Sequence, residues 1–179
     1  MLVSVIQLTS KSNKKKNLAV AEALMKRAVQ QGAEVIALPE YFACVGTKDE
    51  MRANAEVKNS DLAYSFLAHF AKTNNVYVLG GSIPTVEVGA TKASGSKLFN
   101  RSTFFSRTGK IMGHYDKIHL FDSELSINST SSKKLRTYKE SDLFSHGQSP
   151  TVIETRFGKI GIAICYDLRF PELFRTMVK

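Results

Sequence analysis

One cysteine stands where an apolar strand pattern changes into a helical one, near the end of this 179-residue sequence. Residues 160–164 alternate isoleucine with glycine and alanine, which predicts a strand buried on both faces. From Phe170 on, apolar residues recur at helical spacing, and Pro171 suits the first turn of a helix. The sequence therefore predicts a sharp strand-to-helix junction with Cys165 at the bend.

Such a junction resembles a nucleophile elbow in which sulfur replaces the usual serine oxygen. The bend exposes the side chain, and the positive end of the following helix favours the thiolate form of a cysteine. The alternative interpretation is a buried free cysteine, which is a common structural use of this residue. From the local pattern around Cys165 alone, both interpretations stay open.

The composition limits the class of protein. A length of 179 residues suits one domain with a real core, and 43% apolar and 23% charged residues are ordinary for a globular chain. The two cysteines, Cys44 and Cys165, are too few for a disulfide framework, and no Cys/His spacing indicates a metal site. We therefore expect no metal and no organic cofactor. A reducing compartment fits best, so we expect a cytoplasmic protein, with a mitochondrial location as the alternative.

The net charge is +9, from 25 basic and 16 acidic residues. A basic chain can bind nucleic acid, but the lysines and arginines are mostly scattered and cluster only at 14–16 and 133–139. We therefore expect no nucleic-acid partner. The N-terminal apolar run, 2–8, is too short for a signal core, and no stretch is long enough to span a bilayer, so we expect no membrane partner.

Periodicity predicts an α/β order of elements. A helix capped by Ser12 or Asn13 and running to about Gln31 separates two apolar strands, which are therefore expected to be parallel. The expected strands are 2–8, 34–38, 76–79, the hairpin 98–105 and 111–115, and the hairpin 151–155 and 158–165; a second helix is expected at 60–75. Three segments are expected to be loops: 43–58, 85–97 and the long excursion 122–149.

A thiol nucleophile needs a base and a group that stabilises developing negative charge. Two other polar residues follow strands directly: Glu40 follows the strand at 34–38, and Lys117 follows the strand at 111–115. Ligands gather at strand ends in open α/β sheets, so these residues are candidate partners of Cys165. The alternatives are that Glu40 caps a turn and that Lys117 forms a surface ion pair.

Three segments resemble the signature blocks of the nitrilase, or carbon–nitrogen hydrolase, superfamily, in the order that the family has them. They are Ala37–Glu40, Tyr115–Phe121 and Gly161–Leu173, and the resemblance covers the whole chain. Residues 80–84, 97–100 and 117–122 further resemble the omega-amidase branch of that family.

The resemblance implies an α-β-β-α sandwich. It also implies that residues 1–179 form a single carbon–nitrogen hydrolase domain, equivalent to the N-terminal two-thirds of the family domain. We therefore expect a chain truncated at its C-terminus, with the sandwich incomplete after the helix that follows Cys165. Family members dimerise through helices, so a homodimer or a higher oligomer is expected.

The resemblance also assigns roles to particular residues. Cys165 matches the nucleophile of the family, Glu40 the general base and Lys117 the lysine that stabilises the tetrahedral oxyanion. Glu140 lies in the segment that matches the second glutamate of the family. The backbone N–H of Tyr166 would be the other oxyanion donor.

The implied activity is hydrolysis of a small-molecule amide through a cysteine thioester, with release of ammonia. The omega-amidase branch acts on the dicarboxylate monoamides 2-oxoglutaramate and 2-oxosuccinamate. Their free carboxylate needs a cation, and Arg169 is the candidate, unless it pairs with Asp167 or Glu172 on the surface. Tyr41 is expected to line the pocket, and its alternative is simple packing.

Two other functions remain open. Another nitrilase-type amidase or an N-carbamoyl hydrolase would use the same catalytic residues. A different class of function is an inactive truncated fragment that serves as an interaction module through its exposed sheet.

Overall fold

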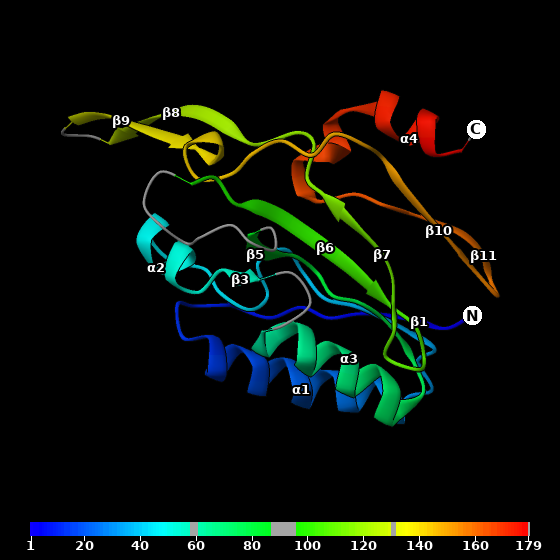
Figure 1. Cartoon of the computed structure of the whole chain (residues 1–179). Helices are drawn as coiled ribbons and strands as arrows, with labels where there is room; N and C mark the ends of the chain where they lie inside the picture. Colours follow the sequence, from blue (N-terminus) through cyan, green and yellow to red (C-terminus); the bar gives the residue numbers. More distant parts are fainter. Residues whose placement is uncertain (58–60, 87–95, 130–131, 179) are drawn as a thin grey trace.

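A computed structural model describes residues 1–57, 61–86, 96–129 and 132–178, with side chains outside 125–136 (Figure 1). The α-helices are α1 (Lys14–Gln30), α2 (Lys48–Ala53), α3 (Leu62–Asn74) and α4 (Pro171–Met177), with short 3-10 helices at Glu140–Asp142 and Cys165–Arg169. The strands are β1 (Val3–Val5), β2 (Val35–Ala37), β3 (Glu56–Val57), β4 (Tyr77–Leu79), β5 (Ile83–Val86), β6 (Phe99–Phe105), β7 (Ile111–Asp116), β8 (Asp122–Ser129), β9 (Ser132–Lys139), β10 (Thr151–Thr155) and β11 (Gly158–Ile162).

Seven strands form one mixed sheet in the order β1-β2-β4-β6-β5-β3, and β7 pairs with β6. Strands β1, β2 and β4 are parallel, which confirms the predicted strand–helix–strand unit at the start of the chain. Strand β6 runs antiparallel to β4, β5 and β7. The hairpins β8–β9 and β10–β11 form separate two-stranded sheets, and β8–β9 extends away from the large sheet (Figure 1).

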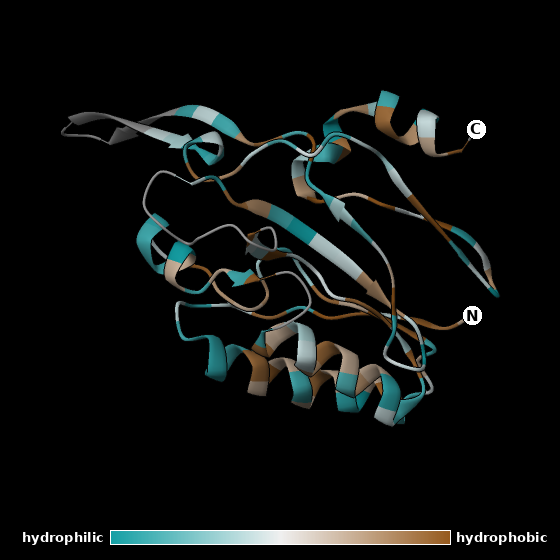
Figure 2. Cartoon of the chain, viewed as in Figure 1, coloured by the Kyte–Doolittle hydropathy of each residue, from teal (hydrophilic) through white to brown (hydrophobic). Residues whose placement is uncertain are grey.

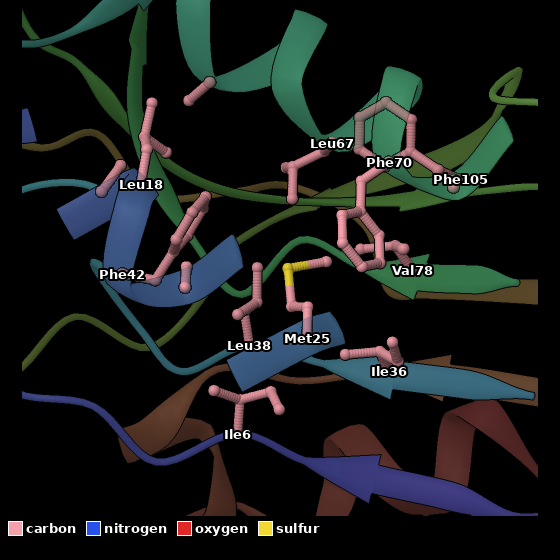
Figure 3. Close-up of a cluster of buried hydrophobic side chains, with 14 of the residues drawn as sticks. Ile6, Leu18, Met25, Ile36, Leu38, Phe42, Leu67, Phe70, Val78 and Phe105 are labelled. Carbon is pink, nitrogen blue, oxygen red and sulfur yellow. The ribbon is translucent and has the colours of Figure 1, made fainter. Parts of the chain in front are cut away.

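The main core lies between the large sheet and the helices α1 and α3. Both helices carry hydrophilic as well as hydrophobic residues (Figure 2), as expected of helices with one buried stripe. Figure 3 shows side chains from α1, α3, β2, β4 and β6 meeting in this layer. The labelled members of the cluster are Ile6, Leu18, Met25, Ile36, Leu38, Phe42, Leu67, Phe70, Val78 and Phe105.

A second core covers the other face of the same sheet. Val35 and Phe104 pack there with Ile153 of β10, Ile162 of β11 and Leu173 of α4. Because side chains alternate across a strand, neighbouring residues such as Val35 and Ile36 enter different cores. The layers therefore run helices, sheet, β10–β11 hairpin and helix, which confirms the predicted α-β-β-α sandwich (Figure 1).

Capping explains where two of the helices begin. Asn13 caps α1, since its side chain accepts a hydrogen bond from the Lys16 N–H at 3.0 Å. The first turn of α3 is capped from a distance, because buried Glu56 accepts from the N–H groups of Ala63 and Tyr64. Lys14 balances this carboxylate at 2.6 Å. The predicted start of the second helix at Ser60 lies outside the described residues.

The three predicted loops are partly wrong. Segment 43–58 contains α2 and β3, and β5 occupies the start of 85–97, whose residues 87–95 lie outside the described part. Segment 122–149 contains the β8–β9 hairpin instead of an irregular excursion. The polar composition of 122–149 gave no sign of this hairpin. Among the described strands, β8 and β9 pair only with each other, so they need no apolar face toward the large sheet.

The segment before Cys165 also differs from its prediction. It was expected to be buried on both faces, but Gly161 and Ala163 are exposed, whereas Ile162 and Ile164 are buried. The reason is that β11 belongs to the separate two-stranded β10–β11 sheet and not to the large sheet. One face of this small sheet packs on the core, and the other face leaves Gly161 and Ala163 exposed. In the part of the chain that the structure describes, no helix is long and apolar enough to cross a membrane.

Candidate active site

Cys165 lies at the predicted bend. Its φ is 48°, in the left-handed region that non-glycine residues seldom adopt, and its side chain is exposed. The chain leaves β11, turns through the 3-10 helix Cys165–Arg169 and enters α4, whose first residue is Pro171. The strained backbone presents the thiol outward from the junction, which is the feature that defines a nucleophile elbow.

Glu40 follows β2 in a second strained turn. The next residue, Tyr41, has a φ of 52°, and its N–H donates to Ser82 Oγ at 3.0 Å. Gly81 approaches the same turn so closely that a Cβ there would lie 2.1 Å from the carbonyl oxygen of Pro39. Contacts from the end of β4 therefore hold the turn that carries Glu40.

Lys117 follows β7, and its side chain is 2% exposed. Its backbone N–H donates to the carbonyl of Asn100 at 2.9 Å, and its own carbonyl accepts from the Gly147 N–H at 2.9 Å. The ammonium group lies 2.8 Å from Glu40 Oε1 and 2.9 Å from Glu140 Oε2. Two carboxylates therefore balance one buried cation.

Glu140 begins the short helix after β9, and donors surround its side chain. Oε1 accepts from the hydroxyl of Tyr41 at 2.5 Å and from the amide of Asn100 at 3.1 Å. Oε2 accepts from Lys117 at 2.9 Å and from the N–H of Phe121 at 2.7 Å. With both oxygens engaged and 2% of the side chain exposed, Glu140 is suited to position other groups.

These side chains meet at one cavity of about 480 Å³. Five of the residues singled out from the sequence line it, and Tyr166 and Arg169 are not among the lining residues. The lining is formed by Glu40, Tyr41, Lys117, Phe121, Thr137, Tyr138, Glu140 and Cys165. Residues from four distant parts of the chain thus face one space that is large enough for a small amide.

Burial and nearby charges shift the pKa values of several residues that line the cavity, including Lys117, Cys165 and Tyr41. Burial alone would lower the pKa of Lys117, but the carboxylates of Glu40 and Glu140 raise it above the ordinary value. Burial, followed by the negative charge of Glu40, raises the pKa of the Cys165 thiol, against a lowering effect of Lys117. Burial and then Glu140 raise the pKa of the Tyr41 hydroxyl. The resting thiol is therefore protonated near neutral pH and needs a base.

Sequence reasoning missed several residues of this site. Asn100 is the second residue of β6, and its side-chain amide donates to Glu40, Tyr41 and Glu140 within 3.1 Å. Asparagine is depleted in strands, so Asn100 within the predicted strand 98–105 is a signal that the sequence offered. Tyr138 lines the cavity from β9, where the missed hairpin gave no signal.

The sequence also left open a surface pairing of Arg169 with Asp167, and this alternative is wrong. Asp167 is fully buried and accepts hydrogen bonds from Tyr115, His119 and Ile164, whereas Arg169 is exposed. Among the residues that the structure describes, no group of three or more His, Cys, Asp or Glu side chains could hold a metal ion.

An exposed thiol at a strained elbow, beside a lysine and two glutamates at one cavity, forms a candidate active site on an α/β fold. Residues 2–179 match the family model described as carbon-nitrogen hydrolase, and the chain belongs to this family. It is 33% identical over 177 residues to omega-amidase NIT3 of Saccharomyces cerevisiae, which covers 96% of this chain and 57% of that protein. It is 35% identical over 178 residues to a deaminated glutathione amidase of Synechocystis, and this match covers 98% of this chain and 61% of that protein.

Solved structures agree with this assignment. Saccharomyces cerevisiae Nit3, a member of branch 10 of the nitrilase superfamily, superposes with a TM-score of 0.76 and 29% identity, covering 96% of this chain and 57% of that one. A carbon-nitrogen hydrolase of Helicobacter pylori superposes with a TM-score of 0.79 and 20% identity. The match covers 99% of this chain and 56% of that one, and it shows the shared fold. The chain spans about half to three-fifths of the length of the curated relatives that it matches.

Proposed function

We propose that this protein is an amidase that hydrolyses a non-peptide carbon–nitrogen bond through a thioester on Cys165. The single observation that carries the proposal is the convergence of Cys165, Glu40, Lys117 and Glu140 at one cavity. A structural role for each residue alone would not require them to meet. Membership of the carbon-nitrogen hydrolase family gives independent support.

In the proposed reaction, Glu40 removes the proton of the Cys165 thiol, and the sulfur attacks the amide carbon. Lys117 and the backbone N–H of Tyr166 stabilise the negative oxygen of the tetrahedral intermediate. Glu40 returns the proton to the leaving nitrogen, and ammonia departs to leave a thioester. Glu40 then takes a proton from water, which attacks the thioester, and the carboxylic acid product leaves with the thiol restored.

The surroundings of the two glutamates support this division of roles. Glu40 is 23% exposed and lines the cavity, so water and substrate can reach it. Glu140 is 2% exposed, and donors occupy both of its oxygens. A carboxylate whose two oxygens are both engaged by donors is suited to anchor Lys117.

For the substrate, we propose the dicarboxylate monoamides 2-oxoglutaramate and 2-oxosuccinamate, because several relatives are named omega-amidases. A second candidate is a deaminated glutathione, because relatives at the same level of identity are named for it. The free carboxylate of either compound needs a cation. Lys117 is already paired, and Arg169 as the carboxylate partner stays a prediction from the sequence.

An ammonia-release assay with 2-oxoglutaramate tests the proposal. We expect Cys165→Ala to abolish hydrolysis and leave thermal unfolding nearly unchanged, because the thiol is exposed and its loss opens no cavity. Mass spectrometry of a quenched reaction is expected to find the acyl group on Cys165. Cys44→Ala is the matched control, since it removes a buried thiol outside the cavity lining and should keep the activity.

Two outcomes would contradict this mechanism. One is full hydrolysis by Cys165→Ala, and the other is an acyl group on a different residue. A folded wild-type chain that releases no ammonia from any of the amides or from an N-carbamoyl amino acid would favour the interaction module instead.

A further inference from the structure

The nucleophile and its partners stand on different sheets. Glu40 and Lys117 follow strands of the seven-stranded sheet, whereas Cys165 follows β11 of the separate β10–β11 hairpin. The distance from thiol to base therefore depends on contacts between these two units. Apolar packing of Ile162 and Ile164 against Phe104 and Tyr115 holds them together, but such packing is non-directional.

A buried carboxylate supplies a directional link between the two units. Asp167 is fully buried, and its Oδ2 accepts from the Ile164 N–H at 2.9 Å, directly before Cys165. The same oxygen accepts from the Tyr115 hydroxyl at 2.8 Å. The other oxygen, Oδ1, accepts from the His119 N–H at 3.0 Å and lies 2.7 Å from His119 Nδ1.

The partners of Asp167 bracket the lysine of the site. Tyr115 and His119 lie two residues before and two residues after Lys117, and the Tyr115 hydroxyl also accepts from the Ile118 N–H at 3.1 Å. The ring of His119 stacks on Phe170 with centroids 3.7 Å apart, just before α4. One side chain thus joins both sides of the Cys165 bend to both sides of Lys117.

We propose that Asp167 is a positioning residue that holds the Cys165 elbow at a fixed place relative to Lys117 and Glu40. It is not among the residues that line the active-site cavity, and it acts through Tyr115, His119 and the Ile164 backbone. Charge-assisted hydrogen bonds are about twice as strong as neutral ones, and four of them from two directions leave the carboxylate little freedom. The kinetic part of this proposal rests on the amidase function, whereas its thiol chemistry does not.

The test compares Asp167→Asn with Glu56→Gln. Both changes neutralise a fully buried carboxylate that accepts backbone hydrogen bonds, but Glu56 caps α3 and none of its described partners lines the cavity. We expect both variants to lower the unfolding temperature. Only Asp167→Asn should lower kcat, by about tenfold or more with little change in KM, since small misplacements of reacting groups cost about that much.

A substrate-free measurement follows the thiol directly. The pH dependence of Cys165 alkylation by iodoacetamide gives the thiol pKa, and Cys44 is too buried to compete. In the wild type, burial and Glu40 raise this pKa, so a displaced elbow should bring it back toward the ordinary value. Tyr115→Phe removes one donor to Asp167 without changing charge, and we expect a smaller pKa shift in the same direction.

Each result decides the proposal. Unchanged kcat and thiol pKa in Asp167→Asn, with a loss of stability like that of Glu56→Gln, would show a merely structural role. A shifted thiol pKa in Asp167→Asn, with an unchanged thiol pKa in Tyr115→Phe, would show a charge effect and overturn the positioning role. A wild-type chain without amidase activity would refute the proposed function, and the thiol measurement would still decide the role of Asp167.

Discussion

The two glutamates at the cavity are chemically alike, and their surroundings divide their roles. After burial, the charge of Glu40 contributes most to raising the pKa of the Cys165 thiol, and the charge of Glu140 contributes less. Glu140 instead meets Lys117, Tyr41 and the Phe121 backbone. The same residue type thus suits the proposed role of base at position 40 and the proposed role of anchor at position 140.

This difference leads to a prediction for Glu40→Gln. Hydrolysis should fall by about 10² to 10⁴-fold, which is the usual contribution of a general base. At the same time the thiol pKa should fall, because the neutral amide no longer opposes thiolate formation while Lys117 still favours it. The variant should therefore form thiolate at lower pH than the wild type, as measured by the pH dependence of alkylation.

Glu140→Gln is the matched control for that measurement. Its carboxylate is the smallest of the effects on Cys165, so the thiol pKa should fall less than in Glu40→Gln. An equal or larger shift in Glu140→Gln would contradict the assignment of Glu40 as the group that faces the thiol.

At the scale of elements, the site depends on tight contacts between strand ends. Gly81, with a φ of 56°, lets the chain after β4 pass against Leu38 and Pro39, directly before Glu40. The hydroxyl oxygen of Ser82 then accepts a hydrogen bond from the N–H of Tyr41. The end of β4 is therefore the support of the Glu40 turn.

We predict that Gly81→Ala lowers both stability and kcat. A left-handed alanine costs about 1–2 kcal/mol, and the added Cβ, 2.1 Å from the Pro39 oxygen, must also push the Glu40 turn aside. Thermal unfolding and steady-state kinetics measure the two effects.

Gly158→Ala provides the comparison for this prediction. Gly158 also has a positive φ, of 109°, but nothing lies within 4 Å of its added Cβ. The Gly158→Ala variant should lose stability through backbone strain alone and keep the kcat of the wild type. Equal kinetic effects in both variants would argue against the close approach as the cause.

At the scale of the whole molecule, one edge of the large sheet is open. Strand β1 pairs only with β2 among the described strands, and Val3 and Val5 are 45% and 79% exposed. These two side chains point away from the core that contains Ile6 and α1. Exposed apolar residues on an unpaired edge favour association with another chain.

We therefore predict that the protein self-associates through β1 and that Val5→Lys weakens this association, because the lysine charge resists burial at an interface. Sedimentation over a range of concentrations measures the effect. Val20→Lys is the control, since Val20 is also half exposed but lies on α1. A purely monomeric wild type, or equal weakening by both variants, would contradict the prediction.

Much of the fold followed from local patterns. The spacing of apolar residues predicted α1, α3, β6–β7 and β10–β11, because each depends on contacts between neighbours in sequence. The strands β3 and β5 escaped prediction, since they pair in parallel across a gap in sequence and carry few residues. The β8–β9 hairpin escaped prediction because its segment is rich in Ser, Lys and Thr and contains few apolar residues.

The sequence by itself determined the bend at Cys165, the polar residues Glu40 and Lys117 at strand ends, and the family to which the chain belongs. Only the tertiary structure decided that these groups share one cavity, that Asn100 donates to Glu40, and that Asp167 links the neighbours of Lys117 to the residue before Cys165. The physical reason is range. Backbone bends and periodicity arise from near neighbours, whereas distances between side chains far apart in sequence depend on how separate sheets pack together.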